Sequence, residues 1–140
     1  MTIDARTLAR ISVVQAIYEQ EIAGGYDLDN KDDLQKKIEA LSEKNDFKRI
    51  NKKLFEQILD IVSRETLIIN EKIKSNLAQN WSMERIGAVI RAILSAAIAE
   101  SMLEEPTDKK IIISEYVRIA SGFYDDKEVK FVNAILDKIL

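Results

Sequence analysis

The sequence has 140 residues, of which 46% are hydrophobic and 32% charged, an ordinary composition for one soluble domain, or two small halves that share a core. It contains no His and no Cys, which excludes Ser-His and Cys-His nucleophilic pairs, the usual zinc sites and disulfides. The net charge is −3, so any nucleic-acid binding must come from a local basic patch rather than from bulk charge.

The sequence has no glycine-rich phosphate loop or dinucleotide fingerprint, and its carboxylates are scattered over charged faces and turns. We therefore expect neither an enzyme nor a bound metal or cofactor. The longest apolar runs, such as Ala96–Ala99 and Ile111–Ile113, fall far short of the roughly 20 residues that span a bilayer. Asp4 and Arg6 interrupt any signal-peptide pattern. These features predict a cytoplasmic protein with no membrane partner.

Only one Pro and four Gly occur, and alternating apolar–polar runs are scarce, so the sequence predicts helices throughout. The first helix is expected at about Asp4–Ala23. It ends at Gly24-Gly25, because a glycine just past a helix end readily adopts the left-handed conformation. Its expected core face is a stripe at helical spacing: Leu8, Ile11, Val14, Tyr18 and Ile22, widened by Val13 and Ile17.

A second helix, short and highly charged, is expected at about Asp32–Glu43, with Leu34, Ile38 and Leu41 as its core face. Residues 47–77 are helix-patterned, but a globular helix seldom runs for about thirty residues, so we expect a kink near Ser63–Thr66. Apolar stripes on both sides of the kink are expected to be buried: Leu54, Ile58, Ile61 and Val62 before it, and Leu67, Ile68, Ile73 and Leu77 after it.

Residues 83–103 contain the most apolar helix pattern, with small residues that would let neighbours approach closely, so this is the expected central helix. Ser82 is a suitable N-cap for it, and Pro106 ends it. Two amphipathic helices follow within residues 111–140, joined by an acidic corner at Phe123–Asp126. The expected core stripe of the last helix is Val129, Val132, Leu136 and Ile139.

The last helix also has a basic face with one aromatic ring. A ring flanked by lysines can stack on an unpaired base while the lysines contact phosphates. The members of this face are Lys127, Lys130, Phe131, Ala134 and Lys138.

Two arginines of the first helix, Arg6 and Arg10, lie one turn apart and could grip adjacent phosphates. Two arginines alone are more often a solvated helix end. Asn133 could contact RNA or make a capping or core hydrogen bond, and both readings stay open. Trp81 is more often a packing anchor than a base-stacking residue. Tyr18 is expected to pack its ring in the core.

Four blocks of the sequence resemble the NusB transcription antitermination factors. The block Phe131–Lys138, FVNAILDK, resembles the closing helix of that family, usually KFVNGILDK, and residues 113–123 resemble its penultimate helix. The block Val14–Tyr18 resembles its V-Q-A-L-Y motif, and Asn80–Ile86 its N-W-x-L-E-R-I stretch. The resemblance covers nearly the whole chain and is weakest between about Tyr26 and Lys53.

The resemblance implies an all-α fold of about seven helices, with packed bundles at about 1–80 and 81–140 forming a single NusB-like RNA-binding domain. It implies a transcription antitermination factor that binds boxA, a short single-stranded element of nascent ribosomal-RNA transcripts, with NusE, a small-subunit ribosomal protein, in an RNA polymerase antitermination complex. The RNA-binding residues implied by the resemblance and the basic face are Arg6, Arg10, Gln15, Lys127, Lys130, Phe131 and Asn133, and the partner-binding residues are Tyr18, Glu84 and Ile90.

The sequence departs from the family at several positions. Thr7 and Leu8 stand where many members carry further arginines, and Ile90 and Lys127 stand where members have acidic residues. These changes leave open an alternative, a helical protein-interaction scaffold or homodimer with weakened RNA binding. Another alternative is the accessory domain fused to some RNA methyltransferases, against which the end of the chain at Leu140 counts.

Two expectations concern where these charged residues lie in the folded protein. The first helix and the last are expected to meet, so that Arg6 and Arg10 form a single cationic ridge with Lys130 and Phe131. Arg91, like Glu100, is a charged residue in an otherwise apolar helix, so each is expected to form a structural ion pair if buried.

Overall fold

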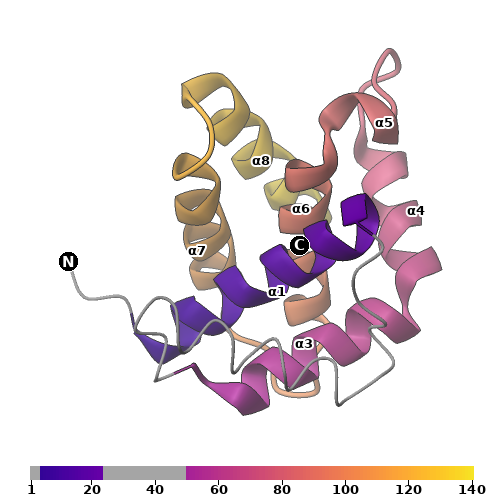
Figure 1. Cartoon of the computed structure of the whole chain (residues 1–140). Helices are drawn as coiled ribbons and strands as arrows, with labels where there is room; N and C mark the ends of the chain where they lie inside the picture. The colour runs from indigo at the N-terminus through magenta and orange to yellow at the C-terminus, as the bar shows by residue number, and fades with distance from the viewer. Residues whose placement is uncertain (1–3, 24–49) are drawn as a thin grey trace.

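The computed structural model describes residues 4–23 and 50–140 (Figure 1). Every regular element in these ranges is a helix, which confirms the all-α prediction. The helix expected at about Asp32–Glu43 lies outside the described residues. No helix in the described ranges is long and apolar enough to cross a membrane. The helices are α1 (Ala5–Ala23), α3 (Lys52–Arg64), α4 (Thr66–Asn76), α5 (Met83–Ile86), α6 (Ala88–Ser101), α7 (Lys109–Ser121) and α8 (Asp126–Ile139).

Helix α6 is the centre of the molecule, as its apolar pattern predicted. It packs against α1, α3, α4, α7 and α8, and Figure 1 shows it among them. Residues 96–100 have no exposed surface. Three of them are alanines, and small side chains let several helices approach the same axis. The expected helix over 83–103 is divided in two, because the backbone turns at Gly87 between α5 and α6.

Helix α1 buries a wider face than the predicted stripe, because α3, α6 and α7 all pack against it. Leu8 and Val14 are buried as expected. Ile22 is 60% exposed, so its prediction as a core residue is wrong. Small residues form much of the buried face instead, including Ala9 and Ala16.

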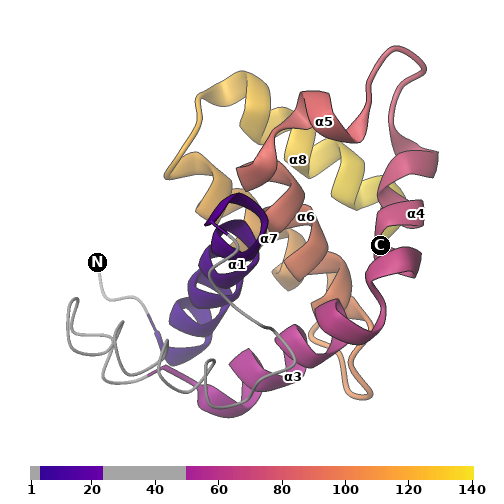
Figure 2. The ribbon, with the colours of Figure 1, turned by 45° about the vertical axis from the view of Figure 1, so that its right-hand side comes forward.

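The long helical pattern after residue 50 breaks at Glu65, within the predicted kink, and Figure 2 shows α4 leaving α3 at an angle. The stripe on α3 is buried as predicted. On α4 the prediction is wrong for Leu67 and Ile68, which are 86% and 48% exposed. The break interrupts the helical repeat, so α4 turns Ile69 and Ile73 to the core instead.

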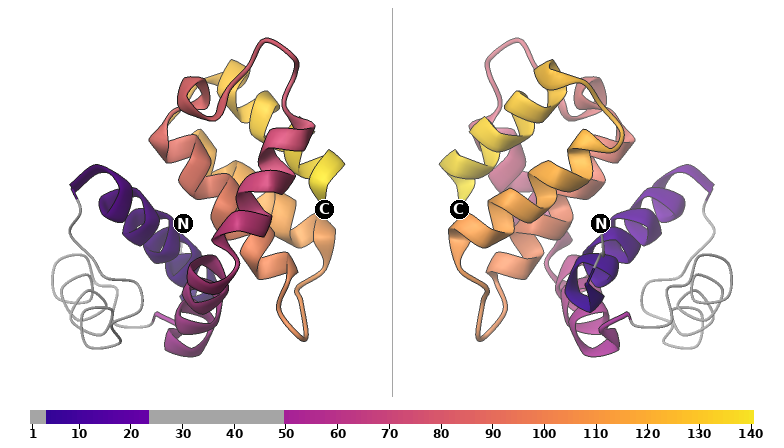
Figure 3. Two further views of the ribbon diagram at one scale, coloured as in Figure 1. Left: turned by 90° about the vertical axis from the view of Figure 1, so that its right-hand side faces the viewer. Right: turned by 90° about the vertical axis from the view of Figure 1, so that its left-hand side faces the viewer.

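Helices α7 and α8 pack side by side (Figure 3), joined near the predicted corner. Val132 and Leu136 have no exposed surface, while Val129 and Ile139 are partly buried against the core. This confirms the predicted stripe of the last helix, to which the structure adds Ile135. The division into bundles at about 1–80 and 81–140 stays a prediction.

Replacement of Gly87 by alanine is expected to lower the free energy of unfolding by about 1–3 kcal/mol. Gly87 has φ of 85° and ψ of 156°, a region that is essentially closed to residues with a Cβ atom. A Cβ built there meets nothing within 4 Å, so the cost is in the backbone and not in a clash. Urea denaturation of both proteins measures it, and equal midpoints would contradict the expectation.

Candidate nucleic-acid interface

Arg10 lies inside the protein, with only 2% of its surface exposed. Its Nε and Nη2 atoms donate to the two carboxylate oxygens of Glu100 at 2.8 Å each, and its Nη1 lies 3.4 Å from Glu115 Oε1. The prediction that Arg10 points outward with Arg6 to grip phosphates is therefore wrong. Glu100 has no exposed surface, and a buried carboxylate needs a cation beside it.

Two further residues complete this buried network, which joins α1, α6 and α7. The Tyr116 hydroxyl donates to Glu100 Oε1 at 3.0 Å, and the Thr7 hydroxyl donates to Glu115 Oε1 at 3.1 Å. Burial raises the pKa of Tyr116 well above its usual value, helped by the charge of Glu100. Burial alone would raise the pKa of Glu100, but the hydrogen bonds and charge of Arg10 outweigh it and lower that pKa.

The structural ion pairs expected for both charged residues of the central helix are confirmed. Glu100 pairs with Arg10. Arg91 pairs with Glu21 at the far end of α1, and its Nη1 donates to the Met83 carbonyl at 2.6 Å. Thr7 and Leu8, where many members of the resembled family have arginines, are buried at 2% and 7% exposure. Both positions therefore face the core and not a ligand.

The Glu100→Gln variant is expected to lose stability that depends on pH. Because the pKa of Glu100 is lowered in the folded state, its carboxylate stabilises the fold above its ordinary value of 4.5, and this contribution is lost as the pH falls through the folded pKa. The groups that face it are Arg10, Glu115 and Tyr116. Urea denaturation should show a gap between wild type and variant at neutral pH that narrows below pH 4.5. A gap that is constant with pH would contradict this.

A groove of about 270 Å³ lies between the 81–90 segment and the first turns of α8. We call it the aromatic groove. The Trp81 and Phe131 rings meet there with centroids 5.9 Å apart and planes 34° apart. Trp81 is 42% exposed, so it is not the buried anchor that was expected. Residues that line the groove are Trp81, Arg85, Ile86, Ile90, Tyr124, Lys127, Glu128 and Phe131.

Short-range contacts within residues 80–85 hold the segment that contains Trp81 in place. Ser82 caps α5 by accepting from the backbone N–H of Arg85, as the sequence predicted, and Arg85 Nη1 donates to the Asn80 carbonyl at 3.1 Å. Lys127 lines the groove, and Lys130, also exposed, precedes Phe131 on α8. Trp81 is the exposed ring of the pair, and Phe131 is half-buried against the core. A ring that reaches the surface can stack on an unpaired base while nearby cations contact phosphates.

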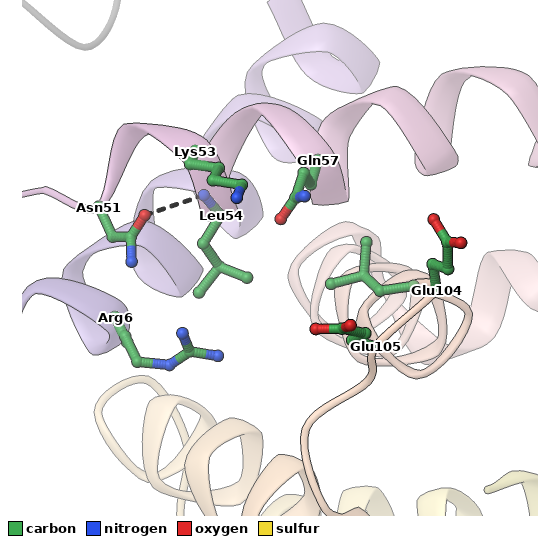
Figure 4. Close-up of a pocket in the computed structure, with 8 residues that line it drawn as sticks. Arg6, Asn51, Lys53, Leu54, Gln57, Glu104 and Glu105 are labelled. Carbon is green, nitrogen blue, oxygen red and sulfur yellow. Dashed lines mark hydrogen bonds between the residues drawn. The ribbon is translucent and has the colours of Figure 1, made fainter.

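Arg6 lies elsewhere, in a second space of about 450 Å³ that we call the N-terminal hollow (Figure 4). Its Nη2 donates to the Thr107 hydroxyl at 3.1 Å. The hollow adjoins the C-terminal end of α6, whereas the aromatic groove adjoins its N-terminal end. Its lining residues are Arg6, Asn51, Lys53, Leu54, Gln57, Leu103, Glu104 and Glu105.

The expected single ridge is therefore wrong. Helix α6 has 14 residues, which at about 1.5 Å per residue separates its two ends by about 21 Å. In Figure 1, the starts of α1 and α3 lie at the lower end of the molecule, and α5 and the start of α8 at the upper end. The structure brings Lys127 and Phe131 together with Trp81, and it leaves Arg6 at a separate site.

The remaining predicted residues fall into three places. Gln15 and Tyr18 line an apolar groove of about 450 Å³ that also contains Phe123, itself 61% exposed. Ile90 is only 6% exposed and belongs to the core, so the prediction that it offers an apolar surface to a partner is wrong. Glu84 and Asn133 are both exposed, on α5 and α8. The sequence reasoning assigned Trp81 to packing and not to a binding site, although the polar residues on both sides of it, Asn80 and Ser82, were a visible signal of an exposed position.

Comparison with known proteins gives consistent matches. The NusB family model matches residues 7–140. Transcription antitermination protein NusB from Mesorhizobium japonicum is 33% identical, over 96% of this chain and 87% of the relative. The protein of the same name from Rhizobium rhizogenes is also 33% identical, over 99% and 87%. The structure of T. maritima NusB superposes with a TM-score of 0.75 at 24% identity, over 98% of this chain and 92% of that one. The solution structure of NusB from Aquifex aeolicus gives 0.72 at 25%, over 98% and 88%.

Proposed function

The chain belongs to the NusB family of transcription antitermination proteins, and on this premise we propose that it binds boxA-type single-stranded RNA in nascent ribosomal-RNA transcripts together with NusE. It acts as a cytoplasmic adaptor in an RNA polymerase antitermination complex, and it has no catalytic role. Contacts with RNA and partner at once give more affinity than either alone.

The aromatic groove is the observation that carries the proposal. Trp81 and Phe131 present two neighbouring rings, and Lys127 and Arg85 line the same groove. The net charge of the chain is −3, so a cationic groove with aromatic rings is a local feature set against an acidic background. A single-stranded RNA meets both requirements of such a groove, since each nucleotide has a flat base and an anionic phosphate.

The proposed RNA-binding residues lie at two separate sites and along α8. Lys127, Lys130 and Phe131 act at the aromatic groove, and Asn133 lies exposed further along α8. Arg6 contributes a more distant phosphate contact from the N-terminal hollow. A bound strand of roughly 4–16 nucleotides, the range seen for single-strand binding sites, is long enough to reach both.

Protein contacts with NusE are assigned to another face. Tyr18 lines the apolar groove between α1, α6 and α7, and its ring is partly buried while Phe123 stands exposed beside it. Gln15 also lines this groove, so we propose that it contacts the partner and not the RNA. Glu84 is exposed on α5. This apolar groove also favours the alternative function, a protein-interaction scaffold or homodimer.

An electrophoretic shift assay separates the two functions. The full chain is incubated with a boxA-type RNA, with and without NusE, and with a scrambled RNA as control. We expect a shift that is specific for boxA and stronger with NusE. No shift in either lane, together with a dimer in sedimentation, would favour the scaffold.

A further inference from the structure

We infer that the N-terminal hollow holds one nucleotide of the bound RNA, with its phosphate on Arg6 and Lys53 and the edge of its base on Glu105. This inference rests on the proposed function, because it places a second part of the same RNA strand. It assigns to Lys53, Gln57 and Glu105 a role that lies outside the aromatic groove.

Opposite charges face each other across the hollow. Arg6 comes from α1 and Lys53 from α3, whereas Glu104 and Glu105 come from the turn after α6. Figure 4 shows the Arg6 guanidinium and the Glu105 carboxylate pointing into the space from opposite sides. Among the described residues, the ion pairs include none between the two. A space of about 450 Å³ therefore separates the cationic side of the hollow from its acidic side. The cationic side can bind an anion, and the acidic side can accept hydrogen bonds.

The cationic wall is held in place by backbone and side-chain contacts. The Asn51 backbone N–H donates to the Ala5 carbonyl at 3.1 Å, and its side chain accepts from the Leu54 N–H at 3.0 Å. The first bond holds the start of α3 beside the start of α1, and the second caps α3. Lys53 and Gln57 are four residues apart, so they share one face of α3. Figure 4 shows both above the same space.

A nucleotide suits this arrangement better than a free phosphate. Glu104 and Glu105 would repel a small anion that filled the hollow, but a nucleotide has its charge at one end only. A carboxylate only accepts hydrogen bonds, so it favours base edges that present donors. Guanine offers two parallel donors, N1–H and the N2 amino group, whereas uracil offers one N–H between two carbonyl oxygens. We therefore expect the hollow to prefer guanine to uracil by about tenfold.

The first test compares two neighbouring lysines. Lys53→Gln is expected to weaken binding of a boxA-type RNA and to reduce the slope of log affinity against log salt by about one. Lys52→Gln removes the same charge one residue earlier, at an exposed position outside the hollow. Its effect should be clearly smaller. Equal effects of the two variants would overturn the inference, because bulk charge would then explain both.

The second test reads the base. RNA variants carry guanine, inosine or uracil at each position in turn, and affinity is measured by filter binding. Wild type should discriminate at one position, with inosine intermediate because it lacks the N2 amino group. Glu105→Gln should abolish that discrimination, while the control Glu71→Gln, exposed on α4, should keep it. Glu105→Gln that strengthens binding of every RNA alike would overturn the inference, since the carboxylate would then act only by repulsion.

These outcomes are distinct from failure of the proposed function. Wild type that binds no boxA-type RNA contradicts the function itself. A different result overturns only the inference about the hollow. In that case RNA binding depends on Trp81 and Phe131, but wild type and Glu105→Gln show the same base preference. If Lys53→Gln and Glu105→Gln instead weaken binding of NusE with RNA affinity unchanged, the hollow is a protein contact and the inference is wrong.

Discussion

Replacement of Arg10 by methionine is expected to lower the free energy of unfolding by about 3–5 kcal/mol. The variant keeps an unbranched apolar stem but removes the guanidinium that binds Glu100 through two hydrogen bonds of 2.8 Å. Glu100 has no exposed surface, so its charge would stay buried with hydroxyl groups, those of Tyr116 and Thr107, in place of a cation. Urea denaturation followed by circular dichroism measures the loss.

Two further variants separate this cause from others. Arg6→Met makes the same chemical change at an exposed position on the same helix, and its effect should stay within about 0.5 kcal/mol. Arg10→Met combined with Glu100→Gln should recover part of the lost stability, because a neutral amide can still accept from Tyr116. The prediction would be contradicted if Arg10→Met were as stable as wild type but defective in RNA binding. Arg10 would then be a direct phosphate contact.

The double variant Trp81→Ala/Phe131→Ala is expected to lose about 10²-fold in affinity for boxA-type RNA. Stacking of a base on an aromatic ring contributes about 1–3 kcal/mol, and about 1.4 kcal/mol corresponds to a factor of ten. Trp81 is 42% exposed, whereas Phe131 is half-buried and also packs against the core, so their removal should cost some stability but leave the helices formed. Isothermal titration with RNA measures the affinity.

Phe123→Ala is the matched control for this variant. Phe123 is an aromatic residue with 61% of its surface exposed, but it lines the Tyr18 groove and not the aromatic groove. Its removal should leave affinity for RNA alone unchanged and weaken binding of NusE. Loss of helix content in the Trp81/Phe131 variant, seen by circular dichroism, would instead make these rings structural.

Much of the fold could be predicted from the sequence, because helix periodicity, caps and breakers are local signals. The apolar run of α6 with its alanines predicted the central helix, and the length of the pattern after residue 50 predicted the break found at Glu65. The exposure of Leu67 and Ile68 could not be predicted, since the break changes which face of α4 meets the core. The turn at Gly87 was missed because an isolated glycine within a helical pattern is often tolerated.

The site was less predictable, because exposure depends on neighbours distant in the sequence. The spacing of Arg6 and Arg10 places them on one side of α1, but only the packing of α6 and α7 shows that Arg10 enters the core while Arg6 stays outside. A signal was present: Glu100 in an apolar helix required a cation, and Arg10 was available. The single ridge failed for a similar reason, since Arg6 lies beside the C-terminal end of α6 and Phe131 beside its N-terminal end. The aromatic groove, where Trp81 contacts Phe131, is therefore the main feature that favours RNA binding.

Fluorescence of Trp81 tests the aromatic groove most directly. The sequence contains one tryptophan, so emission from the full chain reports on this groove alone. Titration with boxA-type RNA should quench the emission in a saturable manner, with the same midpoint as the electrophoretic shift, and Phe131→Ala should move that midpoint to higher RNA concentration. A clear electrophoretic shift with Trp81 emission unchanged at saturation would contradict the account, because the RNA would then bind away from these rings.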